Sequence, residues 1–329
     1  MTAPRILAVG EINPDIIVRG TRDIHFGQLE DIVDDTSITV GSSVAIMACG
    51  AARLGADIRL VGVIGDDYFG DFITGRLRDR DVDVTAVRVA PGVATGSSVI
   101  LVSAQDHTDR HILTHLGSMT MLSADDVTDE LIGQTDHLHV GSWFLHTNAR
   151  EDLGERLAFA RTQGITTSVD PNHDPDLVWD GGLQAALRHV DLLLCNESEA
   201  RGLAGHDEPE EAARLLLSRL APATGRPGLP AVVLKLGAQG AVVFHGDVET
   251  RVPAPVVEVA DTVGAGDTLT AAVLVELLSG ADWNVTLPLG VAAASLSTTQ
   301  VGGVDGQPTM NQARSLAASL PVTTSQGAS

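Results

Sequence analysis

The sequence predicts an α/β protein in which a mostly parallel β-sheet is covered by helices on both faces. Apolar runs of strand length alternate with segments of helical period along most of the chain, and this alternation is typical of parallel sheets with crossover helices. The composition agrees, because 44% of the 329 residues are hydrophobic and 19% are charged, as in folded globular proteins. The chain is long enough to bury a sizeable core.

The predicted strands are short aliphatic and β-branched runs, and the predicted helices are longer segments in which apolar positions recur with helical spacing. In chain order, strands are expected at residues 6–12, 58–65, 137–141, 166–170, 192–196 and 231–236, with antiparallel additions at 241–245 and 250–252. Helices are expected at residues 43–54, 69–80, 149–163, 182–189, 208–220, 266–278, 285–299 and 311–320.

Two stretches lack this alternation. Residues 16–40 contain short β-like pieces, and residues 97–116 contain two adjacent strands joined by a polar turn at residues 105–109. A small sheet built from segments at about 14–40 and 95–118 would form a lid over the carboxyl edge of the main sheet, where α/β folds bind ligands. The alternative is an irregular hairpin on one face. The small and polar residues 321–329 predict a disordered tail.

The charge and hydropathy patterns exclude several classes of partner. Asp and Glu number 43 against 21 Lys and Arg, so the net charge of −22 should repel nucleic acid. No apolar run of about 18 residues is present and the N-terminus lacks the pattern of a signal peptide, so we expect a cytoplasmic protein without a membrane partner. Cys49 and Cys195 occur in unrelated settings, which predicts neither a disulfide framework nor a cysteine metal site.

The basic residues exclude one nucleotide-binding motif. Lys235 is the only lysine, and the other 20 basic residues are arginines. A Walker A loop needs a lysine followed by Ser or Thr, whereas Leu236 follows Lys235. A nucleotide site in this chain must therefore be built in another way.

A glycine-rich turn, Asp261-Thr-Val-Gly-Ala-Gly-Asp267, opens directly onto an apolar helix. Its glycines let consecutive backbone N–H groups point to one spot, and the helix adds its positive N-terminal end, so the turn predicts an anion site. A carboxylate at Asp267 suits a general base that takes a proton from an attacking hydroxyl. The alternative is that Asp267 only caps the helix. Leu269 stands where a dinucleotide fingerprint would need glycine.

The stretch DTVGAGDTLTAAVL at residues 261–274 resembles the C-terminal signature of the ribokinase/PfkB carbohydrate kinase family, and residues 41–70 resemble its N-terminal signature. The motifs SVDPN (168–172), NESEA (196–200) and KLGAQG (235–240) follow the family's order. The resemblance covers nearly the whole chain. It implies a ribokinase-like domain over residues 1–320, with a Rossmann-like core, a β-sheet lid and ATP-dependent phosphorylation of a sugar or nucleoside hydroxyl.

The resemblance also implies roles for residues of the glycine-rich turn. Asp267 matches the family's catalytic base, and its anion hole is matched by Gly264, Ala265 and Gly266. Asp261, with backbone carbonyls near residues 302–303, matches a site that holds a monovalent cation such as K⁺ in some members.

Further residues are matched on the ATP side. Asn196 and Glu199 match the Asn-x-x-Glu motif that handles Mg²⁺ and the nucleotide phosphates, and a hard cation does prefer oxygen ligands. The structural alternative is a solvated Glu199 in the first turn of a helix. The turn beside the nucleotide is matched by Lys235, Gly237 and Gly240, although these glycines alone would indicate a hairpin turn.

On the substrate side, Asn13 and Asp15 match the strand end that binds sugar hydroxyls, and buried hydroxyls need such partners. Relatives commonly have Gly-Gly and then an Asn that contacts the sugar, whereas this chain has Gly41, Ser42 and Ile46. The side chain of Ile46 can neither donate nor accept a hydrogen bond. The pocket is therefore predicted to hold a sugar other than ribose or a substrate with an apolar portion, or to be rotated toward Ser42 and Ser43.

Three functions follow from these observations. A sugar kinase is favoured by Asn13, Asp15 and the turn at 261–267. A nucleoside kinase of the same fold is the second hypothesis, because Ile46 would give a nucleobase an apolar wall. A non-catalytic sugar-binding regulatory module is the third, and the intact Asp267 with its amides argues against it.

The lid segment also predicts an assembly. Its apolar residues Val99, Leu101 and Ile112 are more than an isolated small sheet could bury. We therefore expect a homodimer formed through the lid.

Overall fold

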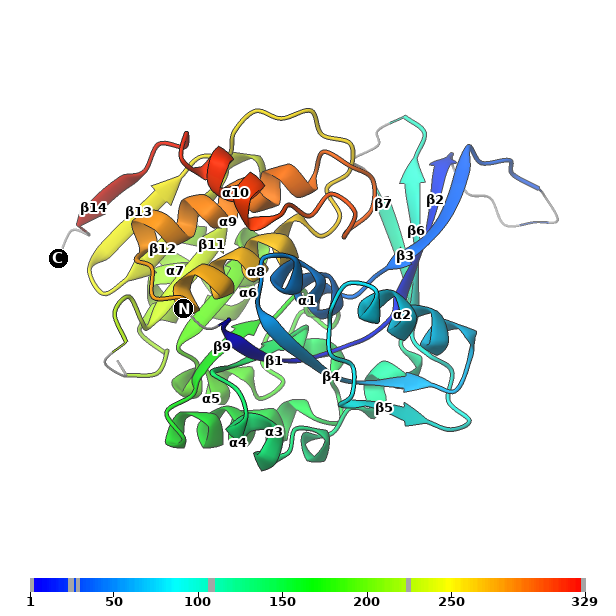
Figure 1. The fold of residues 1–329 in the computed structure, drawn as a ribbon, viewed down its shortest axis with the longest axis horizontal. Coiled ribbons are helices and arrows are strands. Elements are labelled where there is room, and N and C mark those ends of the chain that lie inside the picture. Colours follow the sequence, from blue (N-terminus) through cyan, green and yellow to red (C-terminus); the bar gives the residue numbers. More distant parts are fainter. Residues whose placement is uncertain (1–2, 23–26, 28–29, 106–109, 223–225, 327–329) are drawn as a thin grey trace.

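Two β-sheets organise the part of the chain that the computed structural model describes, residues 3–22, 27, 30–105, 110–222 and 226–326 (Figure 1). The large sheet has the order β14-β13-β12-β11-β10-β9-β8-β1-β4-β5. Its strands are β1 (Arg5–Val9), β4 (Asp57–Gly65), β5 (Val87–Ala90), β8 (His137–Gly141), β9 (Thr166–Asp170), β10 (Leu192–Asn196), β11 (Ala231–Lys235), β12 (Ala241–His245), β13 (Val248–Val252) and β14 (Thr323–Gln326). Neighbours from β11 to β5 pair in parallel, and β12 to β14 are added antiparallel.

Helices cover both faces of this sheet, which confirms the predicted α/β fold (Figure 1). One layer consists of α1 (Ser43–Arg53), α2 (Tyr68–Arg78), α8 (Ala265–Leu278), α9 (Trp283–Ser297) and α10 (Met310–Ala317). The other consists of α3 (Asp129–Gly133), α4 (Arg150–Thr162), α5 (Leu183–Ala186), α6 (Glu197–Ala204) and α7 (Pro209–Leu217). Strand residues alternate between the two cores, with Ile6 and Ala8 in the first and Leu7 and Val9 in the second, as the two-residue period of a strand requires.

A second, four-stranded sheet, here called the lid, projects beside the large sheet (Figure 1). Its order is β3-β2-β6-β7, from β2 (Pro14–Thr21), β3 (Asp35–Val40), β6 (Ser97–Ser103) and β7 (Arg110–His115). The two predicted segments therefore do pair, through parallel β2 and β6. Of the predicted turn at residues 105–109, residues 106–109 lie outside the described residues, as do residues 23–26 and 28–29 of the first lid segment.

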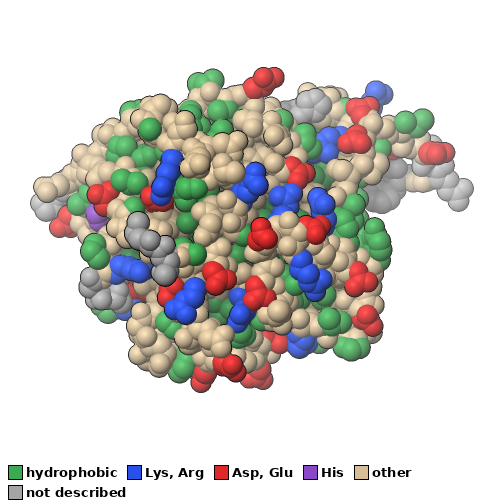
Figure 2. All heavy atoms as spheres, in the orientation of Figure 1, with side chains coloured by type: hydrophobic (Ala, Val, Ile, Leu, Met, Phe, Trp, Pro, Cys, Tyr) green, Lys and Arg blue, Asp and Glu red, His purple; other side chains and the backbone are tan. Residues whose placement is uncertain are grey.

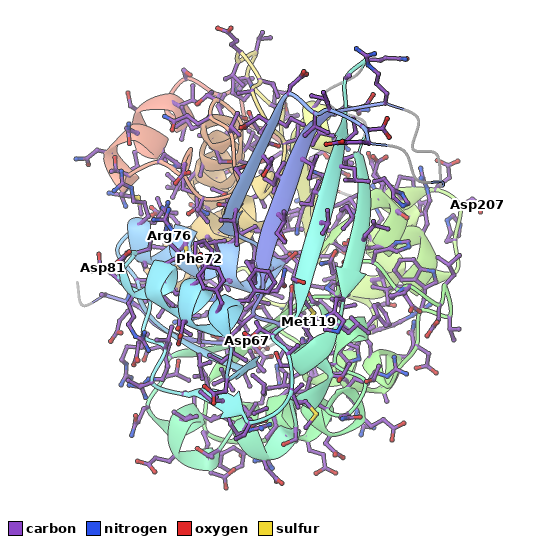
Figure 3. All side chains as sticks on the ribbon, turned by 90° about the vertical axis from the view of Figure 1, so that its right-hand side faces the viewer. Asp67, Phe72, Arg76, Asp81, Met119 and Asp207 are labelled. Atoms are coloured by element: carbon purple, nitrogen blue, oxygen red, sulfur yellow. The ribbon has the colours of Figure 1, made fainter. Side chains whose placement is uncertain are left out.

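The register of the lid strands divides its side chains between two faces. Ile17 lies opposite Ile100, which lies opposite Ile112, and Ile17 and Ile100 are buried. Val99 and Leu101 lie on the other face, which we call the outer face, and are half-buried. Figure 3 looks onto the lid from its outer side, with Phe72 of α2 beside it. Of the three apolar residues named from the sequence, Ile112 is thus on the inner face.

The predicted strands and helices agree with the structure to within a few residues, with four exceptions. The strand β5 and the short helices α3 and α6 were not expected. The prediction of a disordered tail is wrong for residues 323–326, because β14 pairs antiparallel with β13. An edge strand leaves unpaired N–H and C=O groups, and threonines suit a strand that covers them. Residues 327–329 lie outside the described residues.

The charge on the surface and the length of the helices are relevant to the predictions about nucleic acid and membranes. On the face shown in Figure 2, acidic and basic side chains are interspersed instead of forming a large patch of one sign. Within the described ranges, every helix is too short or too polar to cross a membrane.

The parallel strands bring chemical groups from distant parts of the chain to one edge of the sheet. Gly141 lies opposite Asp170 at the ends of β8 and β9, and Asn196 lies opposite Lys235 at the ends of β10 and β11. Since carboxyl ends of parallel strands share an edge, the polar residues there become neighbours. This edge holds the candidate site.

Candidate active site

Lys235 lies at the centre of the site, against the glycine-rich turn. Its Nζ donates to Asp170, whose Oδ2 also accepts a hydrogen bond from Thr270 Oγ1 at 2.9 Å. A Cβ atom added to Gly266 would lie 3.7 Å from Nζ. Burial opposes the charge on Lys235, but the carboxylates of Asp170, Glu199 and Asp267 raise its pKa. The amine therefore stays positive beside the predicted anion hole.

The glycine-rich turn presents unpaired backbone donors. Gly264 is the N-cap of α8 in a left-handed conformation with φ of 73°, and no side chain caps this helix. A Cβ atom here would lie 2.7 Å from the carbonyl oxygen of Gly303, so only glycine fits. Among the described contacts, the N–H groups of Gly264, Gly266 and Asp267 have no acceptor, while that of Ala265 reaches the Thr262 carbonyl at 3.4 Å. These free donors at a helix N-terminus can hold an anion.

Asp267 lies in the first turn of α8 with a half-buried side chain that makes no hydrogen bond to any described residue. No described contact therefore supports the alternative that Asp267 caps the helix. Burial raises the pKa of Asp267 well above its ordinary value; the amine of Lys235 opposes this shift, and the carboxylates of Asp170, Glu11 and Glu199 add to it. The group has the proton affinity and the free lone pairs that a base requires.

Asn196 and Glu199 form a capping box at the start of α6. Asn196 Oδ1 accepts from the N–H of Glu199, and Glu199 accepts from the N–H of Asn196, both at 2.9 Å. Glu199 is only 3% exposed, so it is in the first turn of a helix but is not solvated. Burial and the carboxylate of Asp170 raise the pKa of Glu199. The Asn-x-x-Glu spacing was the available signal for α6.

The glycines of residues 237–240 lie in the turn that joins antiparallel β11 and β12. Gly237 is exposed with no neighbour within 4 Å of an added Cβ atom, so its backbone is open to a ligand. Gly240 is buried, and a Cβ atom there would lie 2.1 Å from the Val252 carbonyl oxygen. Only the first of the two glycines is placed to approach a nucleotide.

Asn13, Asp15 and Gly41 come together where β2 begins. Asn13 Nδ2 donates to Asp15 Oδ1 at 3.2 Å, and Gly41 pairs its N–H with the Asn13 carbonyl. Burial, and then the carboxylate of Glu11, raises the pKa of Asp15 to about 7, while Arg110 and Asn13 oppose the shift. This pair carries the donors and acceptors that sugar hydroxyls need.

The structure gives Ser42 and Ile46 structural contacts. Ser42 Oγ donates to the Glu11 carbonyl at 2.6 Å and accepts from the N–H of Ala45 at 3.0 Å, as the N-cap of α1. Ile46 is 3% exposed and packs beneath the glycine-rich turn, since its Cγ2 would lie 2.8 Å from a Cβ atom on Gly264. Neither side chain is aimed at open space.

The sequence analysis missed a second polar cluster, around Glu11. Glu11 Oε1 accepts from the N–H of Ser43 at 2.9 Å and from Ser142 Oγ at 2.8 Å. Asn172 Nδ2 donates to the hydroxyls of Ser43 and Ser142, at 3.0 and 3.2 Å. Glu11 Oε2 is buried without a described hydrogen-bond partner, and burial raises the pKa of Glu11. The signal was present, since Glu11 precedes Asn13 and Asn172 ends the SVDPN motif.

Asp261, the other predicted metal ligand, is held by one side chain and two backbone N–H groups. Its Oδ2 pairs with Arg19 at 3.2 Å and accepts from the N–H of Gly302 at 3.1 Å, and its Oδ1 accepts from the N–H of Val263 at 3.0 Å. The described residues contain no group of three His, Cys, Asp or Glu side chains placed to hold a metal ion.

Comparison with known proteins gives a consistent result. The description "pfkB family carbohydrate kinase" matches residues 3–310. The 2-dehydro-3-deoxygluconokinase of Thermoproteus tenax is 31% identical over 298 residues, which are 85% of this chain and 86% of that protein.

Solved structures share the fold at lower identity. The Arabidopsis thaliana ribokinase complexed with ribose and ATP has a TM-score of 0.80 and 23% identity, covering 96% of this chain and 99% of its own. A protein of E. coli described as a ribokinase II, in complex with ATP and Mg²⁺, has the same TM-score, identity and coverage. Both likenesses show the fold.

We predict that Gly41→Ala disturbs the Asn13 and Asp15 pair. A Cβ atom at this position would lie 2.0 Å from Asp15 Oδ1 and 2.9 Å from Asn13 Nδ2. Because the buried carboxylate must move, the free energy of unfolding should fall by about 1–3 kcal/mol. Urea denaturation measures this change.

The matched control is Gly75→Ala in α2, where an added Cβ atom has no neighbour within 4 Å. This change should raise the free energy of unfolding by about 0.5–1 kcal/mol, because alanine favours a helix. A Gly41→Ala protein as stable as the wild type would contradict the crowding that we describe.

Proposed function

Because the chain belongs to the pfkB family of carbohydrate kinases, we propose that it transfers the γ-phosphoryl group of ATP to a sugar hydroxyl, with Asp267 as the general base. The observation that carries this proposal is the unpaired carboxylate of Asp267 beside the unpaired N–H groups of Gly264 and Gly266. A base and an anion site next to each other are what phosphoryl transfer to a hydroxyl needs.

The proposed chemistry moves one proton and one phosphoryl group. As the sugar oxygen forms its bond to phosphorus, its proton passes to Asp267, and the bond from phosphorus to the leaving oxygen of ADP breaks. The N–H groups of Gly264 and Gly266 hold the charge on the phosphoryl oxygens. The positive amine of Lys235, which lies against Gly266, adds to this stabilisation.

Asn196, Glu199 and the open turn at Gly237 are proposed to hold the nucleotide and Mg²⁺. The carboxylates of Asp170, Glu199 and Asp267 surround one lysine, so a phosphate chain needs a further positive charge to enter. Mg²⁺ usually takes one or two carboxylates and keeps several waters. Both oxygens of Glu199 accept hydrogen bonds from Asn196, so Glu199 would contact the ion through its waters. When bound, the ion would neutralise phosphate charge. The capping box would fix Asn196 and Glu199 for this contact.

A monovalent cation at Asp261 does not fit the residues present. Both oxygens of Asp261 accept backbone N–H groups, and Arg19 already places a positive charge on Oδ2. We therefore derive no catalytic step through K⁺.

Asn13 and Asp15 are proposed to bind the sugar, with Glu11 as a further acceptor. The nearby Glu11 Oε2 is buried without a described hydrogen-bond partner, with His146 Nε2 4.0 Å away, and such an atom suits a sugar hydroxyl. An ADP-release assay over ribose, fructose, 2-dehydro-3-deoxygluconate and nucleosides identifies the substrate.

The nucleoside hypothesis loses its main argument, because Ile46 packs beneath the turn. Release of ADP with a sugar would also exclude the non-catalytic module. An ATP-dependent enzyme is expected where ATP is made and used, in the cytoplasm.

Asp267→Asn should abolish most turnover without unfolding the protein. The side chain makes no described hydrogen bond, so its replacement should change the free energy of unfolding by less than about 1 kcal/mol. Loss of the base should lower kcat by about 10²–10⁴. ATP affinity should hold or improve, because a negative charge is removed.

The matched control is Asp282→Ala, which removes a real helix cap. Asp282 accepts from the N–H groups of Asn284 and Val285 at the start of α9. It should cost about 1 kcal/mol of stability and leave kcat unchanged. If Asp267→Asn kept wild-type kcat while binding ATP, Asp267 would not be the base.

Lys235→Met should move the acid limb of the pH profile of kcat/KM for the sugar to higher pH. Asp267 accepts a proton only when ionised, so activity rises with pH through its pKa. Burial raises that pKa and Lys235 lowers it, so removing the amine should raise it further. Lys235→Arg keeps the charge and should keep the limb near its wild-type position. An unmoved limb in Lys235→Met would show that another group sets it.

A homodimer through the outer face of the lid is proposed, because Val99 and Leu101 are half-buried there and Leu113 of β7 is 51% exposed. Light scattering at micromolar protein should give twice the mass of one chain. Leu101→Asp should shift the protein to a monomer, since it places a charge on that face. The matched variant Ile32→Asp, at an exposed residue outside the strands, should stay dimeric. A monomeric wild type would refute this assembly.

A further inference from the structure

The ion pair between Arg19 and Asp261 joins the lid to the glycine-rich turn. Arg19 Nη2 lies 3.2 Å from Asp261 Oδ2, and the two side chains are only 20% and 14% exposed. The same guanidinium donates to Ser37 Oγ at 3.4 Å and lies 4.0 Å from Asp35 Oδ2, both on β3. Two lid strands thus hold this positive charge in place.

Asp261 in turn holds two loops together. Its oxygens accept the N–H groups of Val263 and Gly302. The residue after Gly302, Gly303, lies close to Gly264. A Cβ atom added to Gly264 would lie 2.7 Å from the carbonyl oxygen of Gly303. The position of this loop therefore sets the shape of the turn that carries the unpaired N–H groups.

We propose that the Arg19 guanidinium is the permanent cation of Asp261, so that this kinase keeps its anion site in shape without a monovalent metal ion. Arginine is always charged and offers only donors. A K⁺ ion needs oxygen ligands and would face the guanidinium at the same carboxylate. Within the described ranges, Arg19 is the only basic side chain that forms an ion pair with Asp261. The inference rests on the proposed function for its activity readout alone.

The arrangement also couples the lid to the site of phosphoryl transfer. Asp15 and Arg19 lie on the same face of β2, since they are four residues apart in one strand. The strand that would contact the sugar through Asp15 thus supplies the charge that orders the anion site through Arg19. A separate metal ion could not link the two sites in this way.

The test compares K⁺, Na⁺ and tetramethylammonium at equal ionic strength, by melting temperature and by turnover. The wild type should give the same melting temperature in all three, and turnover should vary by no more than about twofold. Arg19→Gln should lose about tenfold in turnover in tetramethylammonium, between the effects of exposed and buried ion pairs. K⁺ should restore that turnover and raise the melting temperature of this variant alone.

Three controls isolate the charge. Arg19→Lys should remain independent of K⁺, and Arg22→Gln removes an exposed positive charge nearby and should behave as the wild type. The double variant Arg19→Gln with Asp261→Asn should lose the response to K⁺, because the site's negative charge is gone.

A wild type that needs K⁺ for turnover, or that K⁺ stabilises as much as Arg19→Gln, overturns the proposal. A fully active Arg19→Gln protein that ignores K⁺ also overturns it. If Arg19→Gln does not fold, the wild type and Arg19→Lys still decide the matter. If no sugar is phosphorylated, the proposed function fails, and the melting temperatures still test the inference.

Discussion

The amine of Lys235, held among the carboxylates of Asp170, Glu199 and Asp267, is the interaction on which the site depends. Two strands and two helices contribute these four groups, and only the parallel pairing of the sheet brings them together. Carboxylates buried without a cation would be costly. In a chain of net charge −22 with one lysine, this amine makes it possible to gather acids there and still admit phosphate.

A second constraint is steric and starts at Gly264. Its left-handed backbone turns the chain into α8 and leaves no room for a side chain between Gly303 and Ile46. The N–H groups stay free because no described residue caps this end of the helix. Asp261 then ties the loop beyond α9 to the same turn. The anion site is therefore a property of two loops and of Ile46 in α1, and not of the signature motif alone.

Much of the fold could be predicted because apolar runs and helical spacing are local signals. β8, β9, β10 and β12 were predicted with the observed bounds, and α8 within one residue. β14 could not be, because its polar sequence forms a strand only through the free edge of β13. The two-faced register of the lid was equally hidden, since it depends on how β2 pairs with β6.

The site residues divide by the same principle of locality. Asp267, Asn13 and Glu199 lie in short motifs, so their types and spacing were informative. The partner of Asp261 could not be predicted, because Arg19 is 242 residues away in the chain and reaches Asp261 only after the lid has formed.

Ile46 shows why a residue that departs from a family motif is hard to interpret from the sequence alone. The absence of an amide there was interpreted as a change in the substrate pocket, but the structure uses the isoleucine as packing between two glycines, 264 and 303. The methyl groups fill the space that the missing Cβ atoms leave, so Ile46, Gly264 and Gly303 act as one packing unit. The choice of sugar is then left to Asn13, Asp15 and the unpaired oxygen of Glu11, where polar atoms still face one another.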